Sequence, residues 1–83
     1  MSQELQKAIE SFCQLIPESK IGKYSPNALD DKRLKKIYDT AITNKENVTP
    51  KHIIDCLKES HPQISEIDIE ECGDTAFKHM LSL

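Results

Sequence analysis

The sequence predicts an all-α protein built from four helices. Each of the expected helices begins with a hydroxyl side chain that can cap the free N–H groups of a first turn: Ser2, Ser25 followed by Pro26, Thr49 followed by Pro50, and Ser65. Proline suits the first helical position because no intrahelical hydrogen bond is lost there. Apolar residues then recur at spacings of three and four, and no long stretch alternates with the period of two that indicates a strand.

The first two helices are expected over residues 2–16 and 25–43. Pro17 ends the first helix, whose apolar positions are Leu5, Ala8, Ile9, Phe12, Cys13 and Ile16. The second helix ends at Thr43, before a polar segment. Its buried residues are predicted to be Leu29, Leu34, Ile37, Tyr38, Ala41 and Ile42.

The last two helices are expected after Thr49 and after Ser65. The third carries Ile53, Ile54, Cys56 and Leu57 and ends near Pro62. Ser65, with Asp68 three residues later, resembles a capping box for the fourth. Its apolar residues are Ile67, Ile69, Cys72, Ala76, Phe77, Met80 and Leu81. Gly73 is a weak point at which this helix could kink.

Length and composition restrict the class of protein. With 83 residues, 37% of them hydrophobic, the chain forms one small domain over residues 1–83, and folding needs most of its apolar side chains. We expect no signal peptide and no membrane insertion, because the basic and apolar segments that these require are absent. Three cysteines, an odd number, indicate reduced thiols in the cytoplasm.

The sequence offers little support for catalysis or for a bound cofactor. His52 and Cys56 are four residues apart and share a helix face, but no third group is placed to orient them. We therefore interpret them as a buried thiol beside a partly exposed histidine. No Cys-x-x-Cys spacing indicates zinc, and two glycines cannot build a phosphate-binding loop. The prediction is a protein that is not an enzyme and binds neither metal nor cofactor.

Residues 9–29 resemble an EF-hand. An apolar helix face at Ile9, Phe12, Cys13 and Ile16 is followed by twelve residues, 17–28, with Gly22 sixth and Tyr24 eighth, and then by Leu29. Residues 64–69 repeat the pattern of a strand residue, a cap and a helix, after a shorter loop. The resemblance implies two helix–loop–helix units, 2–43 and 49–81, joined by at most a two-residue strand bridge between Tyr24 and Ile64.

The same resemblance implies that calcium binding has been lost. An EF-hand loop coordinates calcium through oxygen atoms at its first, third, fifth, ninth and twelfth positions. Those positions hold Pro17, Ser19, Ile21, Ser25 and Ala28, none of which carries a carboxylate. Lys20 and Lys23 add positive charge to the loop, so we expect no calcium to bind.

A calcium-free lobe of this kind resembles calmodulin-like proteins and myosin light chains, which bind amphipathic helices. The implied partner is a basic helix of the IQ type, as in a myosin heavy chain. Residues 44–83 would suit it, because they carry four Lys against eight Asp or Glu. By analogy, the partner-binding residues are Phe12, Ile16, Leu29, Ile37, Ile53, Leu57, Phe77 and Met80.

Two alternatives remain open. An unrelated helical bundle could act as a small inhibitor, immunity or adaptor protein that binds a partner through the acidic face. Residues 48–65 also resemble the first part of a winged helix-turn-helix. Its recognition helix would carry Glu66, Asp68 and Glu70, which the phosphates of a nucleic acid would repel, so we expect no nucleic-acid binding.

Overall fold

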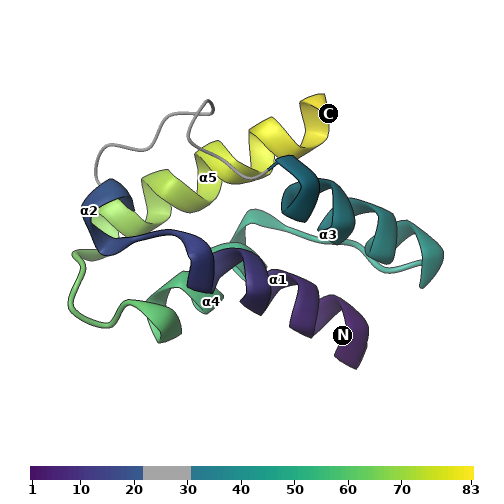
Figure 1. The fold of residues 1–83 in the computed structure, drawn as a ribbon, viewed down its shortest axis with the longest axis horizontal. Helices are drawn as coiled ribbons and strands as arrows, with labels where there is room; N and C mark the ends of the chain where they lie inside the picture. Colours follow the sequence, from purple (N-terminus) through teal and green to yellow (C-terminus); the bar gives the residue numbers. More distant parts are fainter. Residues whose placement is uncertain (22–30) are drawn as a thin grey trace.

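The computed structural model describes residues 1–21 and 31–83, which contain four long helices and one short helix (Figure 1). They are α1 (Gln3–Leu15), α2 (Glu18–Ile21), α3 (Asp31–Thr43), α4 (Pro50–Ser60) and α5 (Glu66–Ser82). These residues form no strand, so the all-α class is confirmed. The single turn of α2 is not predicted by the sequence. Gly22, Tyr24, Leu29 and the expected helix start at Ser25 lie outside the described residues, and so does one partner of the expected Tyr24–Ile64 bridge.

The helix ends follow local chemistry. The Ser2 hydroxyl accepts a hydrogen bond from the Leu5 amide at 3.2 Å, and the Ser65 hydroxyl accepts one from the Asp68 amide at 3.3 Å. At the start of α4 the Thr49 amide donates to Nδ1 of His52 at 3.2 Å, which gives this histidine a capping role that spacing alone does not reveal. α1 ends at Leu15, because the residue before a proline is driven into extended backbone.

The long helices pack as two hairpins that share one core. α1 packs on α3 and α4 packs on α5, while further contacts between α1 and α4 and between α3 and α5 join the hairpins (Figure 1). The largest fully buried side chains come from every helix: Leu5, Ile9, Phe12, Ile21, Leu34, Ile37, Ile53, Leu57 and Ile69. All of the apolar positions expected in the first helix are buried, as predicted.

Two residues of α3 depart from the prediction of burial. Tyr38 is 41% exposed and Ile42 is 58% exposed. At about 100° per residue, Leu34, Ile37 and Ala41 occupy the face of α3 that is buried in the core, and Tyr38 and Ile42 fall on one flank of it. The prediction failed because the apolar stripe of α3 is wider than the surface that the neighbouring helices cover.

A left-handed residue ends α3 and directs the following loop back to α1. Lys45 has φ 53°, its amide donates to the Ile42 carbonyl at 3.1 Å, and the Glu46 amide donates to the Ala41 carbonyl at 2.8 Å. This is the Schellman pattern of a helix C-terminus. It carries Glu46 to α1, where its two carboxylate oxygens accept hydrogen bonds from the Ser2 amide at 2.9 and 3.1 Å.

Gly73 provides a close approach between α4 and α5, and α5 continues through it from Glu66 to Ser82. A Cβ atom at this position would lie 2.4 Å from Cγ1 of Ile54 on α4. The glycine is therefore explained by the packing of the two helices.

We expect Lys45→Gly to raise the free energy of unfolding by about 0.5–1 kcal/mol, because glycine adopts positive φ without the steric cost that lysine bears. Urea denaturation measures the change. Lys45→Ala is the control, since it removes the charge and keeps the strain. An equal gain in Lys45→Ala would assign the effect to charge.

Gly73→Ala should lower the free energy of unfolding by about 1–2 kcal/mol, since crowding against Ile54 outweighs the helix propensity gained by alanine, which is about 1 kcal/mol. In an Ile54→Ala background the same substitution should be neutral or stabilising. A double-mutant cycle followed by thermal denaturation tests this. Equal costs in both backgrounds would contradict the close-packing explanation.

Candidate partner-binding surface

The eight residues predicted to bind a partner lie mainly in the core. Phe12, Ile16, Ile37, Ile53, Leu57 and Met80 are buried. Phe77 packs against the core but remains partly exposed. Leu29 lies outside the described residues. The six buried residues therefore belong to one hydrophobic core, and a partner would reach them only if the helices separated.

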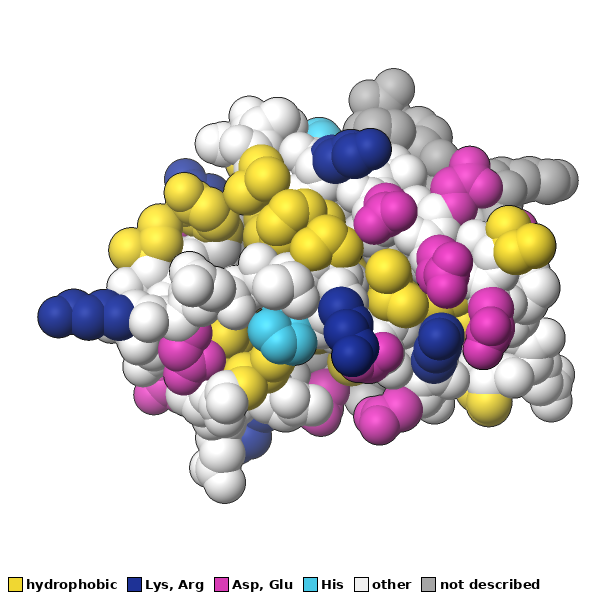
Figure 2. Space-filling view, turned by 180° about the vertical axis from the view of Figure 1, so that it is seen from behind, with side chains coloured by type: hydrophobic (Ala, Val, Ile, Leu, Met, Phe, Trp, Pro, Cys, Tyr) yellow, Lys and Arg dark blue, Asp and Glu magenta, His cyan; other side chains and the backbone are white. Residues whose placement is uncertain are grey.

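A different set of apolar side chains faces solvent on α3 and α5. We call it the α3/α5 apolar surface and define it as Tyr38, Ile42, Phe77 and Leu81; Leu81 is 58% exposed. Figure 2 shows hydrophobic side chains gathered on the left half of one face, on the side of the molecule where α3 and the C-terminal end of α5 lie. Exposed apolar side chains gathered on one face are typical of interaction sites.

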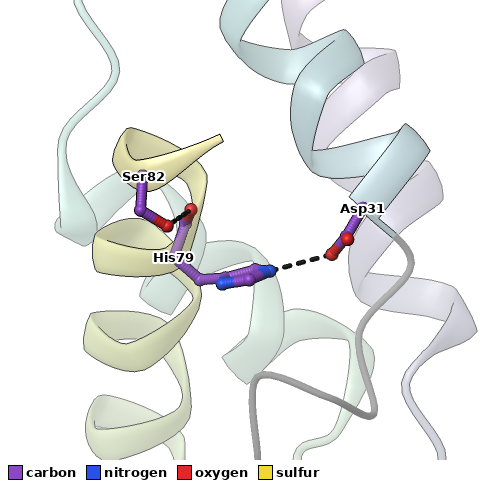
Figure 3. Close-up of polar contacts among 3 residues, drawn as sticks. All are labelled: Asp31, His79 and Ser82. Atoms are coloured by element: carbon purple, nitrogen blue, oxygen red, sulfur yellow. Dashed lines mark hydrogen bonds and ion pairs between the residues drawn. The ribbon is translucent and has the colours of Figure 1, made fainter.

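A polar contact between the helices shows which flank of α3 carries the exposed pair. Asp31, Tyr38 and Ile42 are seven and four residues apart, so they lie in one row along α3. Asp31, at the start of this row, accepts a hydrogen bond at 2.8 Å from Nε2 of His79 on α5 (Figure 3). The opposite flank, with Arg33, faces α1, where Arg33 contacts the Ser11 hydroxyl. Tyr38 and Ile42 therefore lie on the α5 side of α3.

The end of α5 is held in place around His79. Its carbonyl oxygen accepts a hydrogen bond from the Ser82 hydroxyl at 2.7 Å, and its ring meets the Asp31 carboxylate (Figure 3). The ring is largely buried, with 19% of the side chain exposed, whereas the carboxylate is mostly in water. The contact fixes the last turns of α5, which carry Phe77 and Leu81, relative to α3.

Acidic side chains continue the apolar row along α5. Glu70, Asp74, Phe77 and Leu81 follow one another at spacings of four, three and four, so one helix face is acidic near its beginning and apolar near its end. Over its whole length α5 carries five acidic side chains and one lysine. A negative potential along this face attracts cationic partners and disfavours anionic ones.

The described residues give no sign of a metal centre or of a bilayer-spanning segment. Within 1–21 and 31–83, no three His, Cys, Asp or Glu side chains are grouped so that they could hold a metal ion. None of the helices described here has both the length and the apolar character needed to cross a membrane. His52 is partly exposed and Cys56 is buried, as the sequence indicated, and Nδ1 of His52 is occupied by the Thr49 amide.

A scan against protein-family models and searches of curated proteins and of solved structures find no match to this chain. The surface described above is therefore interpreted from its own chemistry. Sequence analysis included Phe77 among the candidates and missed Tyr38, Ile42 and Leu81. The sequence feature that could have identified them is the width of the apolar stripe in each helix, which is larger than the surface that one neighbouring helix covers.

We expect Asp31→Ala and His79→Ala each to lower the free energy of unfolding, with a coupling energy between them of at most about 1 kcal/mol, because one partner is well exposed to water. A double-mutant cycle in urea measures the coupling. Ser82→Ala is the control, since it removes a neighbouring hydrogen bond and leaves the contact intact. A zero coupling would show that the two side chains do not stabilise the α3–α5 arrangement.

Proposed function

We propose that this protein is a non-enzymatic binding module for a basic, amphipathic helix of a partner protein, similar to an IQ motif, and that it binds without calcium. The exposed α3/α5 apolar surface carries the proposal. A domain of this size has few apolar side chains to spare, and here Tyr38, Ile42 and Leu81 are left in water. A helix docked on them would bury this area.

Charge supports the choice of a basic helix. A partner helix lying along α5 would place its apolar side chains on Phe77 and Leu81 and its Lys or Arg side chains near Asp74 and Glu70. The attraction accelerates association and weakens at high salt. An acidic helix would meet like charge in the same position.

The buried candidates define a second mode of binding for the same partner class. In an EF-hand-like lobe the partner helix would enter between separated helices and contact Phe12, Ile53, Leu57 and Met80. The two modes differ in a measurable way. Docking on the surface leaves the core amides protected from hydrogen exchange, whereas entry into the core perturbs them.

The test uses labelled synthetic peptides with the IQ pattern, titrated with the protein in buffer containing a calcium chelator. Fluorescence anisotropy gives the dissociation constant, and amide chemical shifts locate the contact. We expect Leu81→Ser and Ile42→Ser each to weaken binding by about tenfold, which corresponds to a truncation cost of about 1.4 kcal/mol at a contact near the centre of an interface.

Leu15→Ser is the matched control. Leu15 is an apolar residue with 50% exposure at the end of α1, and it is not part of the α3/α5 apolar surface. Its substitution should leave the affinity unchanged. Equal losses in all three variants, or tighter binding of an acidic peptide of the same apolar pattern, would overturn the proposal.

A further inference from the structure

Two cysteine side chains meet between α1 and α4. Cys13 lies on α1 and Cys56 on α4, and their thiols are close enough for each to shift the pKa of the other. The Cys13 Sγ atom also lies 3.9 Å from the carbonyl oxygen of Ile53, one turn before Cys56. All three cysteines of the chain are free thiols. The fold therefore brings together two sulfur atoms that are 43 residues apart in the chain, with no disulfide between them.

The two sulfur atoms of this pair differ in their access to solvent. Cys56 is 6% exposed and lines a hollow of about 440 Å³ between α1 and α4. The other lining residues of this hollow are Glu10, Gln14, Glu59, Ser60 and His61. Cys13 and Cys72 are completely buried. A small reagent that enters the hollow can therefore contact Cys56 and neither of the other two thiols.

His61 joins the two helices beside this hollow. It is 7% exposed, and its Nε2–H donates to the carbonyl oxygen of Cys13 at 3.3 Å, since a carbonyl oxygen can only accept. Its Nδ1 has no hydrogen-bond partner and lies 3.8 Å from the carboxylate of Glu18. The histidine thus holds the end of α4 against the backbone of the residue that carries the inner thiol.

The interaction between the two thiols shifts their pKa values in opposite directions. Interaction with the Cys13 thiol stabilises the Cys56 thiolate and lowers the pKa of Cys56, although burial and the carboxylates of Glu10 and Glu59 oppose this effect. The same interaction, together with burial, raises the pKa of Cys13 above its usual range. Burial raises the pKa of Cys72 to about 11. The accessible sulfur is therefore also the nucleophilic one.

We propose that the hollow between α1 and α4 is a thiol–disulfide exchange site for small disulfides that carry no net negative charge, with Cys56 as the attacking thiol and Cys13 as the resolving thiol. The Cys56 thiolate attacks one sulfur of the small disulfide RS–SR, a Cys56–SR bond forms, and RS⁻ leaves. Cys13 then attacks Cys56, the Cys13–Cys56 disulfide forms, and the second RS⁻ leaves. The proton of Cys13 passes to a released thiolate. Two protein thiols are oxidised and one small disulfide is reduced to two thiols.

Charge at the hollow sets the preference among disulfides. Glu10 and Glu59 both line it and both act electrostatically on Cys56. Their negative field raises the local concentration of a cationic reagent and lowers that of an anionic one, and salt screens the effect. This preference distinguishes a defined site from a thiol that is merely exposed by unfolding.

The experiment compares cystamine, which is dicationic, with oxidised glutathione, which is anionic. Each is added to the folded protein at low ionic strength, and rates are followed by intact mass and peptide mapping. Each rate is divided by the rate of the same reagent with the urea-unfolded chain, which corrects for differences in intrinsic reactivity. We expect a Cys13–Cys56 disulfide with Cys72 unmodified, and a normalised preference for cystamine of roughly tenfold. Glu59→Gln should lower the ratio of the normalised cystamine rate to the normalised rate for oxidised glutathione, and added salt should also lower it.

Three cysteine variants separate the steps. Cys13→Ser should stop the reaction at a Cys56 mixed disulfide, Cys56→Ser should abolish the fast reaction, and Cys72→Ser is the matched control with an unchanged rate. The rate of attack should begin to rise at a lower pH than that of an ordinary cysteine, since the pKa of Cys56 is lowered. Where a variant fails to fold, the peptide map of the wild-type protein after reaction shows whether the Cys13–Cys56 disulfide forms and whether Cys72 stays unmodified.

Several results would overturn the proposal. One is equal modification of the three cysteines, and another is a rate that equals the rate of global unfolding. A normalised preference for oxidised glutathione would also contradict it, as would a folded Cys13→Ser variant that accumulates no mixed disulfide. The site does not depend on the proposed helix-binding function, and the peptide titrations test that function separately.

Discussion

The packing of α1 on two neighbours at once is the constraint on which the rest of the structure depends. One face of this helix contacts α3 and also α4, so the same side chains close both hairpins into a shared core. Its first turn is held by the Glu46 carboxylate, and its last turn contacts α4 through Cys13 and His61. Because α1 packs on α3 and α4 packs on α5, each of these two partners keeps a flank that none of the described helices covers. The apolar and acidic row on α5 and the apolar pair on α3 exist for this reason.

Much of the fold could be predicted from the sequence, because the signals involved are local. The caps at Ser2, Thr49 and Ser65 lie at the helix starts, and the spacing of three and four identifies most of the core. The single turn of α2 was missed, since four residues are too few to show a period. The role of Gly73 was also missed. Helix propensity treats any glycine as a defect, and only the position of Ile54 on another helix explains it.

The candidate surface was harder to predict than the fold. Tyr38 and Ile42 match the helical period as well as Leu34 and Ile37 do, and periodicity cannot tell which apolar residues a neighbouring helix will cover. That depends on how the helices cross, which is a property of the whole core. Pairs distant in sequence were equally hidden: His79 with Asp31, Glu46 with Ser2, and Cys13 with Cys56. Each joins side chains whose proximity only the packed helices create.

The arrangement of α1 also determines the order in which the chain can complete its core during synthesis. The ribosome makes α1 before α3, α4 and α5, yet α4 covers part of the apolar face of α1. That face stays incompletely covered until α4 has been made. α4 and α5 are separated only by residues 61–65, so they can pair at a small entropic cost as soon as both exist. Among the described helices, the one translated first is therefore among the last to be enclosed, and the nascent chain carries an unfinished apolar surface until α4 has emerged.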